Sequence, residues 1–139
     1  MPVYPYIVFN GNCREAVEFY AAVFETEKTK ILTFGEVPPD PDYPILEDAK
    51  DLVIHTSLNI KGSKVMFSDA LPGADYSPGN NISLTVVSSN LDDILYLYNR
   101  LKEGGSVDME LQETFWSKYY ASLRDKFGVL WQLNYEESI

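Results

Sequence analysis

Apolar side chains recur along the chain with two different spacings. Between residues 13 and 24 they return every three or four positions, which places them on one face of a helix. A second stretch with the same spacing begins after Asn90. Asn12 and Asn90 stand where N-cap residues are expected, and Glu15 completes a variant capping box behind Asn12. The pattern therefore predicts two amphipathic helices.

Segments rich in β-branched and aromatic residues predict strands on either side of these helices. In chain order they cover residues 3–9, 28–34, 52–60 and 64–68 around the first helix, and residues 81–87, 107–115, 118–124 and 129–134 around the second. Lys61-Gly62-Ser63 joins two of them as a hairpin. Each helix therefore follows one strand and precedes three.

The two halves of the pattern repeat each other. A shift of 78 residues superposes Asn12 on Asn90 and Tyr20 on Tyr98. Chance similarity between two amphipathic helices would explain the helices, but it would not explain the matching order of strands around them. We therefore predict an α+β chain of two βαβββ modules, at about residues 1–70 and 81–139. A linker rich in proline and glycine, residues 71–80, joins them.

Residues 35–50 break the pattern in the first module. Four prolines stand there among several carboxylates, so no regular element is expected. An insertion of this length in a compact domain is more often a functional lid or an interface arm than neutral filler, and all three remain open.

Composition excludes several classes of function. The chain has 139 residues, which suits one domain, and no apolar run approaches the roughly 18 residues of a membrane helix. Its net charge of −10 repels a phosphate backbone, so nucleic acid is not expected as a partner. Neutral or cationic ligands are easier to accommodate, although excess carboxylates also serve solubility alone. No targeting segment is visible, so a cytoplasmic location is expected.

Four segments carry a resemblance to a known family. They are residues 6–20, the tetrad Asn-Ile-Ser-Leu at 81–84, the run Leu-Gln-Glu-Thr-Phe-Trp at 111–116, and residues 125–132. Together they resemble the PhnB-like branch of the glyoxalase/bleomycin-resistance/dioxygenase (vicinal oxygen chelate) superfamily. The resemblance implies a single domain over residues 1–139, with curled mixed sheets around a concave cavity. It also implies a homodimer.

The same resemblance allows a test for a metal. Metal-dependent members place four His or Glu ligands on inward-facing strand positions. In this chain those positions fall near Pro5, near Met66 or Ser68, near Asn81, and at Gln132. Imidazole and carboxylate are the ligands that Zn, Ni or Fe sites need, and none stands there. We therefore expect no metal and no other cofactor.

Histidine, glutamate and cysteine side chains in the chain have catalytic potential. His55 lies on a predicted strand, where it is either a general base facing the cavity or a hydrogen-bonded core or rim histidine, and we favour the second interpretation. Glu110 and Glu113 are the carboxylates that could act with it. Cys13 lies on the predicted buried face of the first helix and is interpreted as inert packing.

Aromatic and amide residues remain as candidates for binding a ligand. By strand alternation, the expected cavity wall carries Phe9, Met66, Ser68, Asn81, Ser83, Gln112, Trp116, Tyr119 and Gln132, with Tyr120 beside them. The surface is apolar with a few neutral polar anchors, which suits an organic ligand of modest size.

Two hypotheses about function follow. The first is metal-free binding of a small organic ligand, cationic or aromatic, as in the antibiotic-sequestering members of the superfamily. The alternative is an isomerase, lyase or dioxygenase with an atypical metal site that uses His55 with Glu110 or Glu113. PhnB-like sequences are also described as ubiquinone-pathway methyltransferases, but no glycine-rich cofactor loop is visible in the chain.

Overall fold

The computed structural model describes residues 1–137 and divides the chain into two compact units, Met1–Tyr76 and Ser77–Ile139. The division falls within residues 71–80, the segment rich in proline and glycine. Each unit has its own sheet and helix, so each is described by itself. Within residues 1–137, no helix combines the length and the apolar character needed to cross a bilayer.

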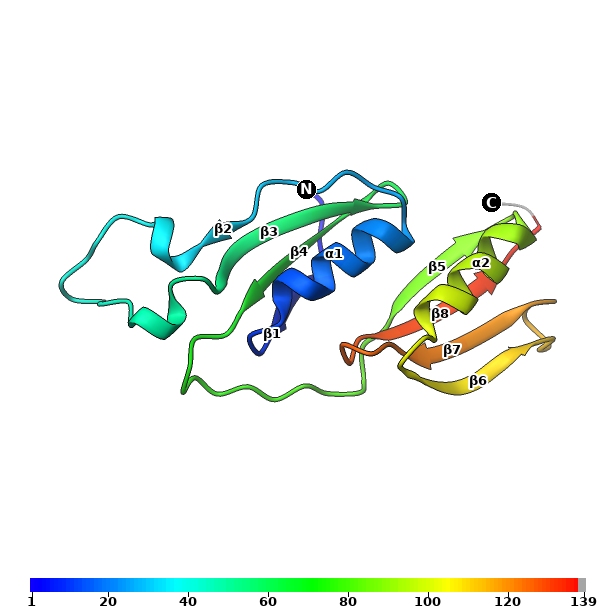
Figure 1. Ribbon diagram of the computed structural model, residues 1–139. Coiled ribbons are helices and arrows are strands. Elements are labelled where there is room, and N and C mark those ends of the chain that lie inside the picture. The colour runs from blue at the N-terminus through cyan, green and yellow to red at the C-terminus, as the bar shows by residue number, and fades with distance from the viewer. Residues whose placement is uncertain (138–139) are drawn as a thin grey trace. The chain divides into compact units, whose positions relative to one another are not determined.

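The first unit is a four-stranded mixed sheet with one long helix (Figure 1). Its elements are β1 (Tyr6–Phe9), α1 (Cys13–Val23), β2 (Leu32–Thr33), the short 3-10 helices η1 (Phe34–Glu36) and η2 (Glu47–Ala49), β3 (Val53–Ile60) and β4 (Ser63–Asp69). The strands lie in the order β1-β4-β3-β2. β1 runs parallel to β4, and the other neighbours are antiparallel.

The second unit repeats this arrangement. Its elements are β5 (Leu84–Ser88), α2 (Leu91–Leu101), β6 (Ser106–Gln112), β7 (Tyr120–Arg124) and β8 (Leu130–Tyr135). The strands lie in the order β5-β8-β7-β6, with β5 parallel to β8 and the other neighbours antiparallel. The predicted α+β fold of two βαβββ modules is therefore confirmed.

One face of each sheet is covered by the helix of its own unit. In the first unit, the ring of Tyr20 on α1 lies 5.9 Å from the ring of Phe67 on β4, and both side chains are buried. In the second unit, α2 packs on β8, where Trp131 and Leu133 are buried. Each fully buried side chain of this size contributes about 1.5–3 kcal/mol to folding. The opposite face of each sheet, called here the uncovered face, has no helix of its own unit over it.

The start of α2 is capped as the sequence predicts. The Oδ1 atom of Asn90 accepts a hydrogen bond from the backbone N–H of Asp92 at 2.9 Å. The hydroxyl of Ser88 accepts from the backbone N–H of Asn90 at 3.0 Å and so fixes the residue that enters the helix. The cap of α2 is therefore built from neighbouring residues alone.

The predicted cap of α1 was wrong. Asn12 makes no side-chain capping bond, and the capping box with Glu15 does not form. The carboxylate of Asp69 takes its place: Oδ1 accepts from the backbone N–H groups of Gly11 and Cys13, each at 3.0 Å. A carboxylate offers a stronger acceptor than an amide at the positive end of a helix, and β4 delivers it there.

The strand predicted over residues 28–34 is reduced to β2. Ahead of β2, hydroxyl groups replace the backbone ladder to β3. Thr29 Oγ1 donates to the carbonyl of Ser57 at 2.5 Å, and Thr56 Oγ1 donates to the carbonyl of Lys30 at 3.2 Å. Side-chain bonds of this kind compete with strand pairing, which explains the short strand.

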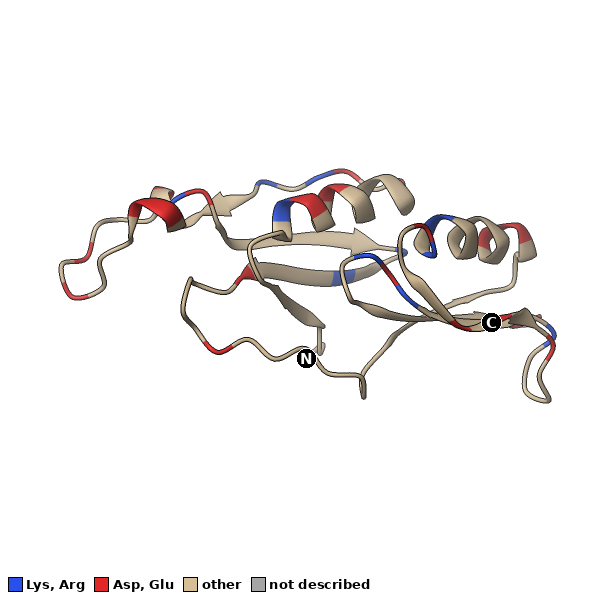
Figure 2. Cartoon of the chain, turned by 60° about the horizontal axis from the view of Figure 1, so that its bottom comes forward, with Lys and Arg blue, Asp and Glu red and all other residues tan. Residues whose placement is uncertain are grey.

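Residues 35–50, called here the proline-rich arm, extend from the first unit without an α-helix or a strand; the prediction of no regular element was wrong only for the short 3-10 helices η1 and η2 at the two ends of the arm. The two ends of the arm are joined, because Gly35 N donates to Lys50 O at 2.9 Å and Phe34 N donates to Leu52 O at 3.0 Å. Figure 2 shows several of its acidic positions along the exposed chain. Tyr43 is among its exposed apolar side chains.

Candidate functional site

The uncovered face of the second sheet carries a set of hydrogen-bonded polar side chains. Gln132 on β8 donates from Nε2 to the hydroxyl of Ser83 at 2.7 Å. At Oε1 it accepts from the hydroxyl of Tyr120 on β7, also at 2.7 Å. Because side chains alternate along a strand, Trp131 and Leu133 face the helix and Gln132 faces away from it. We call Ser83, Gln132 and Tyr120 the amide cluster.

Two aromatic rings adjoin the amide cluster. The ring of Trp116 lies 5.3 Å from that of Tyr120 at an interplanar angle of 75°, and 5.1 Å from that of Phe115 at 87°. Trp116 is 53% exposed and Phe115 is 98% exposed. Burial raises the pKa of Tyr120, which keeps its phenol protonated and able to donate to Gln132. The cluster thus combines neutral hydrogen-bonding groups with exposed ring surface.

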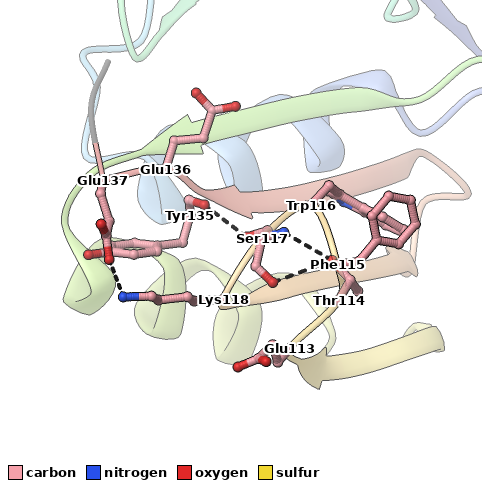
Figure 3. Close-up of a pocket in the computed structure, with 9 residues that line it drawn as sticks. All are labelled: Glu113, Thr114, Phe115, Trp116, Ser117, Lys118, Tyr135, Glu136 and Glu137. Atoms are coloured by element: carbon pink, nitrogen blue, oxygen red, sulfur yellow. Dashed lines mark hydrogen bonds and ion pairs between the residues drawn. The ribbon is translucent and has the colours of Figure 1, made fainter.

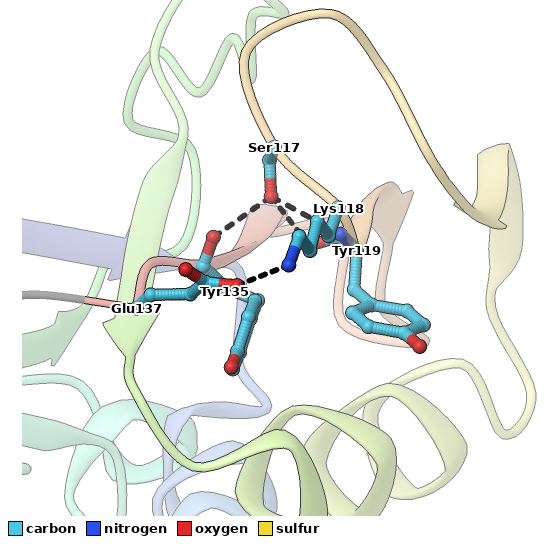
Figure 4. Close-up of polar contacts among 5 residues, drawn as sticks. All are labelled: Ser117, Lys118, Tyr119, Tyr135 and Glu137. Carbon is cyan, nitrogen blue, oxygen red and sulfur yellow. Dashed lines mark hydrogen bonds and ion pairs between the residues drawn. The ribbon is translucent and has the colours of Figure 1, made fainter.

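The loop that presents these rings is tied to the sheet by Ser117 (Figure 4). The hydroxyl of Ser117 donates to the carbonyl of Tyr135 at 2.8 Å and accepts from the backbone N–H of Tyr119 at 3.2 Å. Within the loop, Thr114 N donates to the carbonyl of Ser117 at 2.8 Å and closes a turn. The two rings therefore project from a turn that is fixed to the end of β8.

A pocket of about 600 Å³ lies between this loop and the chain that follows β8 (Figure 3). It is lined by Glu113, Thr114, Phe115, Trp116, Ser117, Lys118, Tyr135, Glu136 and Glu137. Lys118 forms an ion pair with Glu137, and this hydrogen-bonded contact raises the pKa of Lys118. The volume is within the range of small-molecule sites. We call it the loop pocket.

Two of the predicted ligand-binding residues do not join the amide cluster. Gln112 on β6 is the register partner of Tyr120, but its Nε2 atom donates to the backbone carbonyl of Glu110 at 3.0 Å. Asn81 lies in a bend before β5 and is exposed. Ser83, Trp116 and Gln132 are the predicted residues that the structure brings together.

Two others lie on faces that the prediction did not expect. Phe9 is 1% exposed and packs against Phe67 under the helix of the first unit, with ring centroids 6.2 Å apart. Tyr119 alternates with Tyr120, and its ring contacts Tyr135 at a centroid distance of 5.6 Å. Phe9 was therefore placed on the wrong face of its sheet, and Tyr119 is separated from the amide cluster.

The uncovered face of the first sheet holds the remaining predicted residues. Met66 and Ser68 on β4 pair in register with Tyr6 and Val8 of β1 and alternate with Phe67 of the core; Met66 is half-buried and Ser68 is buried. His55 on β3 is exposed, and its Nδ1 atom lies 3.4 Å from the hydroxyl of Tyr6. This placement corresponds to the rim interpretation of His55.

Comparison with known proteins establishes the family. A family model described as 3-demethylubiquinone-9 3-methyltransferase matches residues 2–134, which span both units. The chain belongs to this family. Its predicted position in the PhnB-like branch is confirmed by the relatives that follow.

Three relatives match over almost the whole chain. Protein YjdN of Escherichia coli is 31% identical over 96% of this chain and 95% of its own. The crystal structure of PA1353 from Pseudomonas aeruginosa has a TM-score of 0.85 and 34% identity, covering 98% of each chain. A putative 3-demethylubiquinone-9 3-methyltransferase, PhnB protein, from Bacillus cereus has a TM-score of 0.80 and 26% identity, covering 98% of this chain and 100% of that one.

A more distant structure supports the fold of the superfamily alone. The fosfomycin resistance protein FosX from Listeria monocytogenes has a TM-score of 0.65 at 10% identity, covering 96% of this chain and 91% of that one. At this identity the similarity concerns the arrangement of strands and helices.

The residues predicted to stand at the four metal-ligand positions do not offer the ligands that a metal site needs. Pro5 uses its carbonyl to accept from Met66 N at 3.0 Å, and both amide atoms of Gln132 are already hydrogen-bonded. Ser68 and Asn81 add no charge. Within the part of the chain that the structure describes, no three His, Cys, Asp or Glu side chains gather as a metal site would require. We therefore derive no chemistry through a metal at these positions.

Cys13 has the environment of a packing residue. It is buried at the start of α1, and burial, followed by the nearby Asp69 carboxylate, raises the pKa of its thiol to about 12. At neutral pH the thiol is protonated, so it is not a nucleophile. The interpretation of Cys13 as inert packing agrees with this environment.

Sequence reasoning missed two residues that shape the site. Phe115 was recognised only as part of a family motif, and Ser117 was not singled out. The spacing of Thr114 and Ser117 around two aromatic residues is a signal for a side-chain-stabilised turn. A turn of that kind between two strands would have indicated that the rings project outward.

Proposed function

We propose that the protein binds a small organic ligand on the uncovered face of the second sheet, without a metal. The ligand stacks on Trp116 and exchanges hydrogen bonds with Tyr120 and Gln132. The observation that carries this proposal is the amide cluster, in which neutral donors and acceptors stand beside an exposed aromatic ring. Such a surface holds a ligand by stacking and hydrogen bonding.

The ligand class follows from the same groups. A planar ring with hydroxyl or carbonyl substituents would stack on Trp116 while its oxygens replace partners of Gln132 or Tyr120. The net charge of −10 disfavours an anionic ligand and favours a neutral or cationic one. The description of the matching family model names an enzyme that acts on demethylubiquinone. The ring of demethylubiquinone carries oxygen substituents of this kind.

Tryptophan fluorescence tests the proposal with 2,3-dihydroxynaphthalene as a neutral planar probe. Trp131 is 2% exposed, so quenching on contact reports mainly on Trp116. We expect saturable quenching, absent in Trp116→Phe. Gln132→Leu should weaken binding roughly tenfold, because the loss of one or two hydrogen bonds costs about 1–2 kcal/mol.

Naphthalene-2-sulfonate is the anionic control and should bind more weakly than the diol. If neither this diol nor other neutral planar aromatics quench saturably, the proposed function is wrong.

A second candidate, the enzyme alternative, is favoured by one contact in the first unit. Tyr6 Oη lies 3.4 Å from His55 Nδ1, so the phenol can orient the imidazole and leave Nε2 available for proton transfer. The carboxylates predicted to act with His55, Glu110 and Glu113, belong to the second unit, so this contact supports a role for His55 and Tyr6 alone. Turnover of a carbonyl or diol substrate that His55→Gln abolishes would favour this candidate over a binding protein.

The cytoplasmic location and the homodimer remain predictions. Light scattering at micromolar concentration tests the second of these, and twice the 15.8 kDa chain mass is the expected result.

A further inference from the structure

The loop pocket has a chemistry different from that of the amide cluster and contains none of its three residues, although Trp116 of the pocket adjoins Tyr120 of the cluster. We propose that the loop pocket binds an organic cation, a quaternary ammonium or protonated amine attached to an apolar or aromatic group. This site goes beyond the proposed function, because its ligand is selected by charge rather than by neutral hydrogen bonds.

The charges of the loop pocket do not cancel. Lys118 is paired with Glu137, which leaves the carboxylates of Glu113 and Glu136. Neither of these two forms an ion pair with any residue in the described part of the chain, 1–137. Glu136 Oε1 accepts only a neutral hydrogen bond, from Asn134 Nδ2 at 3.1 Å. The pocket therefore offers two negative charges to a ligand.

Aromatic side chains line the same pocket as these carboxylates. Phe115 is 98% exposed and contacts Trp116 edge to face, so much of its ring is open to a ligand. The face of an aromatic ring attracts a cation, most strongly when the cation is weakly hydrated, as a quaternary ammonium is. Rings together with carboxylates thus select an organic cation over a hydrated metal ion.

The pocket is also fixed in shape before a ligand arrives. Ser117 joins its two walls through the hydrogen bond to the carbonyl of Tyr135, and Thr114 closes the turn that bears the rings (Figure 3). A preformed site avoids the entropy cost of ordering a loop on binding. The positive charge of Lys118 is held by Glu137, so an anion finds no open partner there.

Calorimetric titration of the full chain with benzyltrimethylammonium tests the proposal, with benzylsulfonate as the anionic analogue. We expect saturable binding of the cation that weakens as salt is added, and no binding of the sulfonate. The double variant Glu113→Gln/Glu136→Gln should lose at least tenfold in affinity. Phe115→Ala should lose about threefold to tenfold, with unchanged thermal stability because the ring is exposed.

A matched control removes two charges elsewhere in the second unit. Glu103→Gln/Asp108→Asn changes the net charge equally, and neither residue lines the loop pocket. This control should keep the affinity within twofold. Equal losses in the two double variants would reduce the effect to the overall charge and overturn the proposed site.

The variant Gln132→Leu separates this site from the amide cluster. It should leave binding of benzyltrimethylammonium unchanged while it weakens binding of the neutral diol. If it abolishes binding of the cation instead, the cation occupies the amide cluster. The loop-pocket proposal then fails, while the proposed function stands.

Discussion

The two units share one topology but use a buried carboxylate in different ways. In the first unit Asp69, at the end of β4, accepts from the backbone N–H groups of Gly11 and Cys13 at 3.0 Å and of Val53 at 2.9 Å. These partners lie 58, 56 and 16 residues away in the sequence. One side chain thus ties the β1–α1 turn and the start of β3 to β4.

In the second unit the buried carboxylate acts locally. Asp125 accepts from Phe127 N at 2.8 Å, Val129 N at 3.1 Å and Trp131 Nε1 at 2.9 Å, all within the β7–β8 turn and the strand that follows it. The helix of this unit is capped separately by Asn90. A repeated topology therefore fixes the course of the strands, but not the side chains that hold them.

The uncovered faces differ as well. The first presents a histidine beside a tyrosine, His55 and Tyr6, whereas the second presents the amide cluster and the rings of the adjoining loop. The side chains of the uncovered faces thus differ between the modules, while large apolar side chains remain buried on the helix-covered faces. Because the amide cluster and the exposed rings lie in the second unit, we place both proposed binding sites there.

Removing Asp69 should have the largest effect. Asp69→Ala leaves three buried or partly buried N–H groups without their acceptor, so we expect a loss of roughly 3–5 kcal/mol in the free energy of unfolding. Asn90→Ala, which removes the local cap of α2 in the second unit, should cost about 1 kcal/mol because water can replace a local cap. Urea denaturation followed by circular dichroism measures both. Equal losses would contradict the contrast between a long-range and a local anchor.

Loosening the loop of the second unit should have a moderate effect. Ser117→Ala removes the hydroxyl that bonds to Tyr135 and Tyr119, and should cost about 1–3 kcal/mol in stability. It should also weaken binding of 2,3-dihydroxynaphthalene at Trp116 severalfold. Ser106→Ala, at an exposed position of β6, is the control and should change neither quantity. If Ser117→Ala binds the diol with the affinity of the wild type, the hydrogen bonds of Ser117 are not needed for binding.

A smaller effect should appear at alkaline pH, through Cys13 in the first unit. The folded-state pKa of its thiol, about 12, lies above the reference value of 9.0. The stability due to the protonated thiol is therefore complete below pH 9 and is lost as the pH rises towards 12. From pH 8 to pH 10 the wild type should lose about 1 kcal/mol more than Cys13→Ala. If the free energy of unfolding changes with pH in the same way in both proteins, the pKa of Cys13 is not raised by folding.

The smallest effect on stability is expected for the proline-rich arm. Replacing residues 37–48 by a Gly-Ser segment of equal length leaves the two backbone bonds at the base of the arm in place. We expect the free energy of unfolding to change by less than about 0.5 kcal/mol, as for other exposed positions. If the arm serves as an interface, light scattering should show a dimer in the wild type and a monomer in this variant. A dimer in both would exclude that role.

The fold could be predicted largely from the spacing of apolar residues. The two helices and the order of strands followed from periodicity, because each element carries one apolar face. The cap of α1 could not be found in this way, since Asp69 lies 56 residues from Cys13 in the sequence. Local patterns predict local caps, as Asn90 illustrates.

The direction of a site residue could be predicted where apolar and polar side chains alternate clearly along its strand. Gln132 lies between Trp131 and Leu133, two large apolar residues that face the helix, so its direction followed from the sequence. β1 reads Tyr-Ile-Val-Phe without a polar residue, so nothing in the pattern fixed the face of Phe9. Tyr119 and Tyr120 are adjacent aromatics, and only the structure shows which of them contacts Gln132.

The most direct test of metal-free binding is a pair of calorimetric titrations with 2,3-dihydroxynaphthalene. One uses protein treated with a chelator, and the other uses the same protein with added Zn²⁺ or Ni²⁺. Vicinal hydroxyls coordinate metals readily, so a hidden metal site would increase the affinity strongly in the second titration. The amide cluster predicts binding in both, with dissociation constants within twofold of each other. Binding that appears only with the metal would contradict this account.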